Sequence, residues 1–201
     1  MSVAGLAISA VGAVVLGVSV VAARGPAIPA WEVRLFRTIN RLPSWLLYPL
    51  WPAMQLGNLA VGAAAGLVVA WCAGELPVAI AVLLATGLKL VAERLIRREL
   101  TVHLPARNRP GSSQPGAILR GGDVPSSGPS FPSGHALLIA ALACVVAPVI
   151  PAGWELIPVA LMVLVMVGRV FVGAHNPLDV ISGAGAGLLV GGLVAALLPP
   201  T

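Results

Sequence analysis

The sequence predicts an all-α membrane protein: a bundle of six transmembrane helices with an interfacial amphipathic helix and one long polar loop. Composition is the first reason, because the 201 residues are 58% hydrophobic and 9% charged, whereas soluble domains carry about 25% charged residues. The mean hydropathy of +0.98 is the second reason. The third is that the apolar residues gather in separate runs, long enough to cross a bilayer core of about 30 Å. We expect one domain over residues 1–201.

The first apolar run, residues 3–23, is predicted to be a transmembrane span. It lacks the basic start of a signal peptide, so we expect it to be retained. Residues 31–42 differ, because apolar side chains recur there at helical spacing among arginines. This pattern predicts an amphipathic helix lying in the membrane interface. The apolar members are Trp31, Leu35, Ile39 and Leu42, and the arginines are Arg34, Arg37 and Arg41.

Residues 44–52 contain two tryptophans and a tyrosine, a composition typical of the membrane surface. They are expected to lead into a second span over residues 54–73. The third span, residues 76–96, is apolar as far as Lys89 and then gains charges. We expect its helix to end near Arg98.

Residues 100–130 form the only long polar segment and are rich in Pro, Gly and Ser. A loop of this length is usually functional or disordered. Three further spans are expected, over residues 133–150, 156–171 and 177–198. Small residues let transmembrane helices approach closely, so the glycines of the last span predict tight packing on a neighbour. They are Gly183, Gly185, Gly187, Gly191 and Gly192.

An even number of spans places both termini on one side of the membrane. The loops after the first, third and fifth spans then share the other side. Residues 89–120, 133–135 and 169–179 are therefore predicted to converge at one membrane face. This convergence is the main structural prediction.

Residues 168–179 place an arginine, a histidine and an aspartate between two apolar runs. Charges at membrane depth are usually functional or paired. Asn176 and Pro177 are typical of a helix start, which puts Asp179 in the first turn. Its carboxylate can then hold one ring nitrogen of His175 and leave the other free as a nucleophile or base. The alternative is an ordinary polar loop between helices, capped by Asn176.

A second polar stretch, Phe131 to His135, opens the fourth span. Ser133 is a good N-cap, and Gly134 would let a ligand approach the backbone. Free amides at a helix start form an anion site, and His135 would face the same space. Simple helix capping explains this stretch equally well when it is taken alone. Its combination with the Arg-x5-His-x3-Asp pattern of residues 169–179 favours an active site.

Together, Pro-Ser-Gly-His at residues 132–135 and Arg-x5-His-x3-Asp at residues 169–179 resemble the last two motifs of the type 2 phosphatidic acid phosphatase (PAP2) family. The resemblance implies a metal-independent lipid phosphatase, with no cofactor. His175 would be the nucleophile and form a phosphohistidine, Asp179 would orient it, and His135 would protonate the leaving alcohol. Arg169, Ser133 and the Gly134 amide would hold phosphate oxygens.

The sequence departs from the family's first motif, Lys-x6-Arg-Pro. Arg109 and Pro110 supply the pair, but Val102 stands seven residues earlier in place of lysine. Lys89, the only lysine, and Arg97 are candidates for the missing cation. Snorkelling to the membrane surface is the alternative for Arg97. Gly168 also replaces the family's usual serine before Arg169, which removes a hydroxyl donor.

The remaining polar residues fit a membrane enzyme rather than other classes. The net charge of +5 suits membrane surfaces and anionic substrates, and no pattern predicts nucleic-acid binding. Cys72 and Cys144 lie in apolar runs, which indicates neither a disulfide nor a metal site. Three polar-loop residues either contact substrate or belong to a solvated loop, and these are His103, Arg107 and Arg120.

The function expected from the resemblance is hydrolysis of a lipid phosphate monoester or diphosphate in the cell membrane. Phosphatidate, phosphatidylglycerol phosphate and polyprenyl phosphates are candidate substrates, and membrane lipids are the other expected partners. A lipid phosphotransferase and a non-catalytic lipid-binding or transport protein are the alternatives. The basic residues of the first loop favour a site that faces the cytoplasm. The sequence leaves the oligomeric state open.

Overall fold

The computed structural model describes residues 1–25, 27–103, 107–122 and 124–200, leaving out the side chains of residues 100–103. Within these ranges the chain is helical and forms no β-strand, as predicted. The helices are α1 (Val3–Ala22), α2 (Ala30–Asn40), α3 (Leu47–Gln55), α4 (Leu59–Ala73), α5 (Leu76–His103), α6 (Pro110–Ser113), α7 (Gly134–Val146), α8 (Ile157–Phe171) and α9 (Pro177–Leu197), with 3₁₀ turns η1 (Ser44–Leu46) and η2 (Ala147–Val149).

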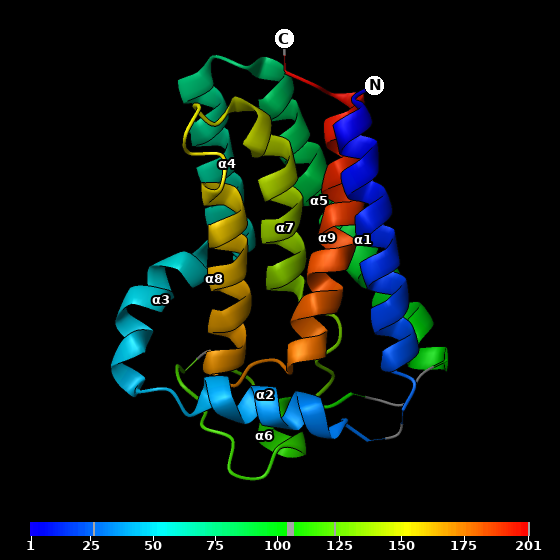
Figure 1. Ribbon diagram of the computed structural model, residues 1–201, viewed down its shortest axis with the longest axis vertical. Helices are drawn as coiled ribbons and strands as arrows, with labels where there is room; N and C mark the ends of the chain where they lie inside the picture. The colour runs from blue at the N-terminus through cyan, green and yellow to red at the C-terminus, as the bar shows by residue number, and fades with distance from the viewer. Residues whose placement is uncertain (26, 104–106, 123, 201) are drawn as a thin grey trace.

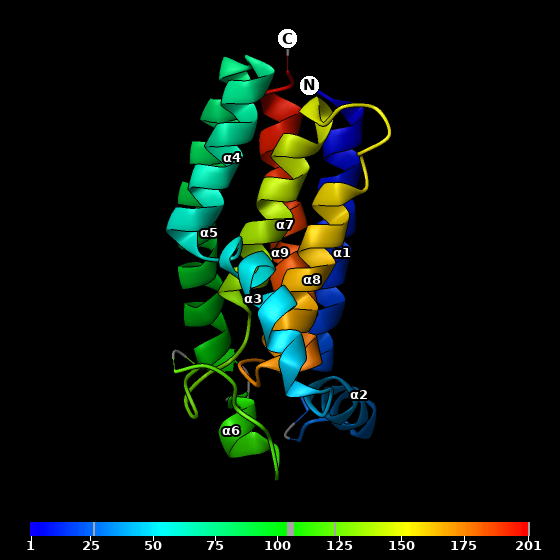
Figure 2. The same cartoon turned by 90° about the vertical axis from the view of Figure 1, so that its left-hand side faces the viewer.

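The long helices run along one axis of the molecule, and both termini lie at the same end (Figure 1). The short helices α2 and α6 and the polar loop cover the opposite end. Turned by 90°, the bundle shows α4 and α5 on one side and α1 and α8 on the other, with α7 and α9 between them (Figure 2). The predicted placement of the termini opposite the polar segments is confirmed.

Helix α9 is central because its glycines let two neighbours approach to backbone contact. A Cβ on Gly192 would lie 2.6 Å from the Ser9 nitrogen of α1, and one on Gly5 would lie 2.7 Å from the Ala196 nitrogen. On the other side of α9, a Cβ on Gly191 would lie 2.7 Å from the Ala141 Cα of α7. The close packing predicted from the glycines is confirmed.

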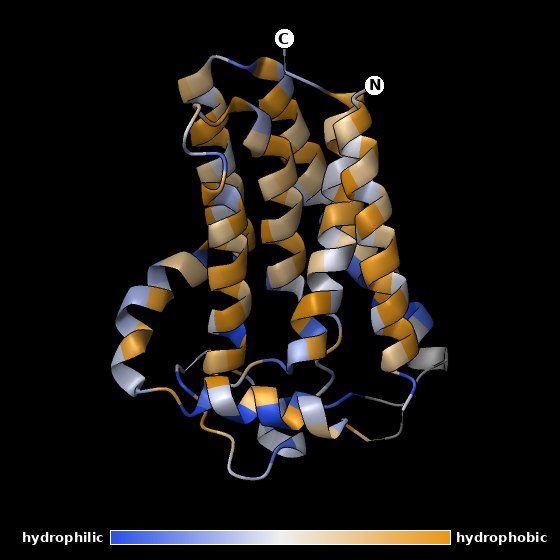
Figure 3. Cartoon of the chain, viewed as in Figure 1, coloured by the Kyte–Doolittle hydropathy of each residue, from blue (hydrophilic) through white to orange (hydrophobic). Residues whose placement is uncertain are grey.

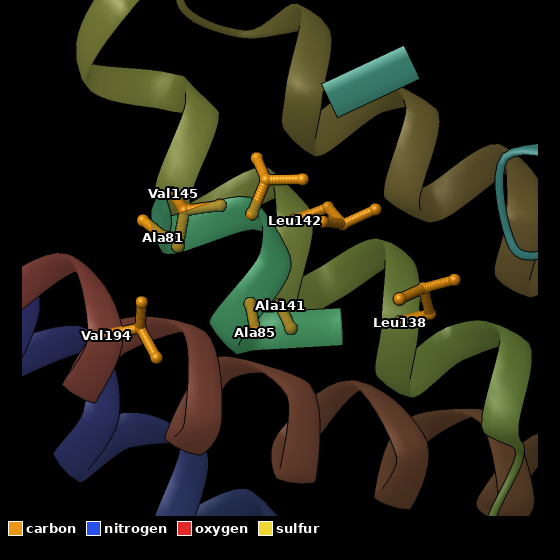
Figure 4. Close-up of a cluster of buried hydrophobic side chains, with 8 residues drawn as sticks. Ala81, Ala85, Leu138, Ala141, Leu142, Val145 and Val194 are labelled. Carbon is orange, nitrogen blue, oxygen red and sulfur yellow. The ribbon is translucent and has the colours of Figure 1, made fainter. Parts of the chain in front are cut away.

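A hydrophobic cluster of small and branched side chains joins α5, α7 and α9 (Figure 4). Each fully buried Val or Leu side chain stabilises the fold by about 1.5–3 kcal/mol. The cluster fixes α7, whose first turn carries the Pro-Ser-Gly-His stretch. Its members are Ala81, Val82, Ala85, Leu138, Ala141, Leu142, Val145 and Val194.

Three described helices are long and apolar enough to cross a membrane: α1, α5 over Leu76–Glu99, and α9. Two further helices that begin at Gly134 and Ile157 are apolar but shorter. Apolar residues dominate the bundle, and hydrophilic ones gather toward the end that holds α2 (Figure 3). The six-span count therefore stays a prediction.

The second predicted span, residues 54–73, is not one helix. The chain bends by 66° between the Ser44–Gln55 segment and α4, and Asn58 caps α4 by accepting a hydrogen bond from the Ala60 nitrogen at 3.0 Å. Gln55, Gly57 and Asn58 interrupt the apolar run at this break, and the sequence analysis did not use that signal. The third span was also predicted too short, because α5 continues past Arg98 to His103.

Helix α2 packs on the protein through a face for which the sequence analysis made no prediction. Glu32, Phe36 and Asn40, one residue per turn, are buried, with Phe36 the one apolar side chain among them. Trp31 and Leu35 of the predicted apolar face are 44% and 40% exposed. Hydrogen bonds satisfy the buried Asn40 side chain and Glu32 Oε1, as buried polar groups require, whereas Glu32 Oε2 has no hydrogen-bond partner within the described residues.

Asn40 and Arg120 fasten one end of α2 to the polar loop and to α8. The Asn40 side-chain nitrogen donates to the carbonyls of Ile118 and Phe171, both at 2.9 Å. Arg120 donates to the Phe171 carbonyl at 2.7 Å and to the Leu42 carbonyl at 3.1 Å. Its guanidinium lies 4.2 Å from the Phe171 ring centroid. Arg120 therefore has a structural role, and the solvated-loop interpretation is wrong for it.

Candidate active site

The polar segments that the topology was predicted to bring together are in direct contact. The Ser133 nitrogen donates to the Asp179 carbonyl at 2.9 Å. The Arg109 Nη1 donates to the Ala174 carbonyl at 3.0 Å. The segments that follow α5, precede α7 and join α8 to α9 therefore meet at the end of the bundle that α2 covers (Figure 1).

Asp179 is fixed by the start of α9 and faces His175. Its Oδ2 accepts a hydrogen bond from the Asn176 nitrogen at 2.8 Å, as part of a capping box. The same oxygen lies 3.8 Å from the His175 Nδ1, so a small ring movement would close a hydrogen bond. Such contacts often tighten only when substrate binds. The carboxylate is thus placed to hold Nδ1 and leave Nε2 free.

His175 is 3% exposed, and its burial has an electrostatic consequence. Burial lowers the pKa of His175, and Asp179 opposes that shift. The imidazole is therefore predominantly neutral at pH 7. A neutral ring with a free Nε2 is the form that can attack an electrophile.

Arg169 lies in the last turn of α8 and organises the loop that carries His175. Its carbonyl accepts hydrogen bonds from the nitrogens of Ala174 and His175, at 3.1 and 3.3 Å. The preceding Gly168 leaves room for Met54, whose Sδ would lie 2.7 Å from a Cβ at that position. The missing serine of the family pattern is therefore explained by packing against α3.

His135 lies half-buried in the first turn of α7, after the N-cap Ser133, whose hydroxyl accepts from the Ala136 nitrogen at 3.5 Å. A Cβ on Gly57 would lie 2.8 Å from the His135 Cβ, so the bend before α4 packs against this histidine. The positive charges of Arg169, Lys89 and Arg109 act on the His135 ring. Gly57 was missed by the sequence analysis, and the available signal was the Gly57-Asn58 pair, which is typical of a turn before a helix start.

Lys89 and Arg97 both pair with a carboxylate that the sequence analysis left out. Glu93 Oε2 lies 2.6 Å from the Lys89 Nζ, and Glu93 Oε1 lies 2.9 Å from an Arg97 nitrogen. Both carboxylate oxygens would lie 2.7 Å from a Cβ on Gly134. Arg97 also donates to the Pro132 carbonyl at 3.3 Å, so it faces the motif instead of snorkelling away. The four-residue spacing along α5 was the available signal.

Two arginines of the polar loop, which follows α5 in the chain, lie at the candidate site. Arg109 is half-buried, and burial together with the charge of Arg97 lowers its pKa. Arg107 is 8% exposed, so the solvated-loop interpretation is wrong for it. Its Nε lies 3.2 Å from Asp179 Oδ1, and its Nη2 lies 2.6 Å from Glu32 Oε1. The side chain of His103 lies outside the described residues.

Comparison with solved structures supports the helical arrangement. The crystal structure of Aquifex aeolicus LpxE matches with a TM-score of 0.63 and 22% identity, over 84% of this chain and 96% of that one. The crystal structure of a transmembrane PAP2-type phosphatidylglycerolphosphate phosphatase from Bacillus subtilis matches with a TM-score of 0.67 and 19% identity, over 98% of this chain and 96% of that one. At these identities the likeness concerns the fold. No curated protein matches the chain.

Comparison with family models reaches further. The model of the PAP2 superfamily matches residues 76–200, which hold α5 to α9 and every predicted site residue. This range is well over half of the chain, and it contains both motifs that suggested the resemblance. The chain belongs to the PAP2 superfamily.

Proposed function

We propose that the chain is a metal-independent membrane lipid phosphatase that hydrolyses a phosphate monoester or diphosphate of a lipid. One observation carries the proposal: a buried His175 facing Asp179, with Arg169, Arg109 and His135 on the segments around it. Phosphoryl transfer depends mainly on positioning and on neutralising the charge of the phosphate oxygens. Cationic side chains and the amides of a helix start supply both.

In the first step the His175 Nε2 attacks phosphorus and the bond to the lipid oxygen breaks. His135 donates a proton to that oxygen, so the lipid leaves as an alcohol or as a shorter phosphate. The phosphorylated ring carries a positive charge, which Asp179 stabilises across Nδ1. In the second step His135 takes a proton from water, the water attacks phosphorus, and the N–P bond breaks to release inorganic phosphate.

Arg169, Arg109, Ser133 and the Gly134 amide hold the phosphate oxygens in this proposal, and Lys89 and Arg97 add positive charge behind Glu93. The substrate is a lipid because the site lies where apolar helices meet a polar surface. Phosphatidate, phosphatidylglycerol phosphate and polyprenyl phosphates all fit this chemistry. We place the protein in the cell membrane as a multi-pass protein.

The test is a phosphate-release screen across these lipids with purified protein and EDTA present. We expect release of free phosphate that EDTA does not reduce. His175→Ala should abolish release while the protein stays folded, and His135→Ala should slow it by at least about a hundredfold, the usual value of a general acid. Full activity of the His175 variant would refute the mechanism. Transfer to another lipid without free phosphate would make the protein a phosphotransferase.

A further inference from the structure

A carboxylate on the interfacial helix is built into the active site. Glu32 of α2 is 0% exposed, which is rare for a glutamate unless it is paired. Its Oε1 accepts from Arg107 Nη2 at 2.6 Å and from the Leu178 nitrogen at 2.9 Å. Leu178 lies in the first turn of α9, so Glu32 also satisfies a free amide of that helix start. The helix that lies across the bundle end thereby touches the element that carries Asp179.

Arg107 connects this carboxylate to the predicted catalytic one. Its guanidinium joins Glu32 through Nη2 and Asp179 through Nε, and the Nε–Oδ1 distance is 3.2 Å. It also lies 5.8 Å from the centroid of the Phe131 ring, just before the Pro-Ser-Gly-His stretch. Arg107 therefore contacts α2, α9 and the segment that opens α7. Its one positive charge is shared between two buried carboxylates.

The division of the Arg107 charge between two carboxylates matters because Asp179 is expected to orient His175 and to stabilise a positive charge on its ring. In a buried site an undivided guanidinium would cancel much of the attraction between Asp179 and a positively charged imidazole. Glu32 offsets that guanidinium, so the set of Glu32, Arg107 and Asp179 carries a net charge of −1. One positive charge on His175 then balances the site, and the proposed phosphohistidine requires that charge.

We infer that Glu32, acting through Arg107, is a positioning residue that keeps the carboxylate of Asp179 oriented and negatively charged toward His175. The inference rests on the proposed function, since it concerns the same nucleophile. It adds an electrostatic role for a residue of the interfacial helix, which the sequence motifs do not include. Burial raises the pKa of Glu32, and the charge of Arg107 opposes that shift and so favours the charged carboxylate.

The test compares Glu32→Gln, Arg107→Gln and the double variant in phosphate release over a range of pH. Glu32→Gln should lower kcat at least tenfold while KM stays within threefold, because the residue does not touch substrate. Loss of a negative charge near His175 disfavours its protonated form, so the acid limb of kcat/KM should move to lower pH. Arg107→Gln removes a positive charge and should move that limb to higher pH.

The double variant separates electrostatics from folding. It restores the net charge of −1, so its acid limb should return toward the wild-type position, and its kcat should exceed the value that multiplying the two single losses gives. Within the part of the chain that the structure describes, Asp179, Arg169 and Arg109 also act on His175, as does the titratable His135, and all four stay unchanged. A merely structural role predicts multiplied losses and unmoved limbs, and that result overturns the inference.

Controls make each failure distinguishable. Glu155→Gln changes an exposed glutamate in the turn between η2 and α8 and should match the wild type. Should Glu32→Gln not fold, Glu32→Asp keeps the charge but shortens the reach; it should lose kcat without moving the acid limb. Wild-type kcat in a folded Glu32 variant refutes the inference. A wild-type protein that releases no phosphate refutes the proposed function instead.

Discussion

His175 combines two conditions that a nucleophilic histidine needs, a neutral ring and an anionic partner. Asp179 lies 3.8 Å from its Nδ1, and burial keeps the pKa of the ring below its ordinary value. Asp179 itself belongs to a capping box, so the same carboxylate starts α9 and faces His175. Local helix chemistry thus positions the proposed catalytic pair.

The lowered pKa of His175 predicts how activity depends on pH. The neutral ring attacks. As the pH is lowered, kcat/KM should therefore still be on its plateau at pH 6.5, the ordinary pKa of histidine, and should fall only at a lower pH. A phosphate monoester titrates near pH 6, so the pKa of each substrate must be measured separately by ³¹P NMR. An acid limb centred at or above pH 6.5, after that correction, would contradict a buried neutral nucleophile.

Glu93 places a negative charge where a phosphate is expected to bind. Both of its oxygens lie beside Gly134, the residue whose amide is expected to hold phosphate. Glu93→Gln should therefore tighten inhibition by inorganic phosphate or vanadate, by about tenfold, which corresponds to about 1.4 kcal/mol. The Ki at pH 7 measures this.

Glu99→Gln, an exposed position on the same helix, is the matched control and should leave the Ki unchanged. Weaker inhibition in Glu93→Gln would instead mean that Glu93 serves to hold Lys89 and Arg97 in place.

At the scale of elements, the contact between α1 and α9 depends on glycine. A Cβ on Gly12 would meet the backbone of Leu189, which cannot move aside as a side chain can. Gly12→Ala should therefore lower the free energy of unfolding by about 1–3 kcal/mol, the usual cost of overpacking. Thermal unfolding in detergent measures this.

Gly17→Ala on the same helix is the matched control. Nothing lies within 4 Å of a Cβ at Gly17, so this change should leave stability equal or slightly higher, since alanine favours helix by up to about 1 kcal/mol. Equal melting temperatures for the two variants would contradict the close packing.

The sequence predicted elements well where apolar runs or caps decide them. The starts of α7 and α9 followed from Ser133 and from Asn176 with Pro177, and the structure confirms both caps. The break before α4 was missed although Gln55, Gly57 and Asn58 interrupt the apolar run there and Asn58 is a good N-cap. The far end of α5 was placed too early, since the helix continues past Arg98 to His103, beyond its ion pairs of Lys89 and Arg97 with Glu93.

The face that α2 buries could not be predicted from periodicity. Its apolar stripe was assigned to the membrane interface, whereas the face that packs on the protein carries Glu32, Phe36 and Asn40. Their partners are Arg107, the Leu178 nitrogen, and the carbonyls of Ile118 and Phe171, all distant in sequence. Pairing between distant segments is the information that a local pattern lacks, and the Glu32–Arg107 pair was missed for that reason.

At the scale of the molecule, an even number of crossings was enough to predict that the polar segments meet. That prediction concerned which end of the bundle each segment occupies, so it survived the errors in helix boundaries. The family match begins at residue 76, yet α1 and α2 also contact the matched helices through Gly192 and Leu178. The candidate site therefore includes residues outside the matched range.

Membrane orientation gives a prediction for the whole chain. The basic first loop favours a cytoplasmic site, which would put the N-terminus outside. Ser2→Cys should then react with an impermeant maleimide added to intact cells, and Ser112→Cys, an exposed position of α6, should not. The background needs Cys72→Ala, because Cys72 is exposed, whereas Cys144 is buried. The reverse labelling pattern would place the site on the outer face.

Helix α2 is anchored near both of its ends, by Glu32 toward α9 and by Asn40 toward α8. If α2 moved away from the bundle, these hydrogen bonds would break and the surroundings of His175 would change. A lipid substrate that comes from the bilayer must therefore enter the site by a route that does not require α2 to move. Substitutions that alter the contact of α2 with lipid headgroups should then lower kcat before they unfold the protein.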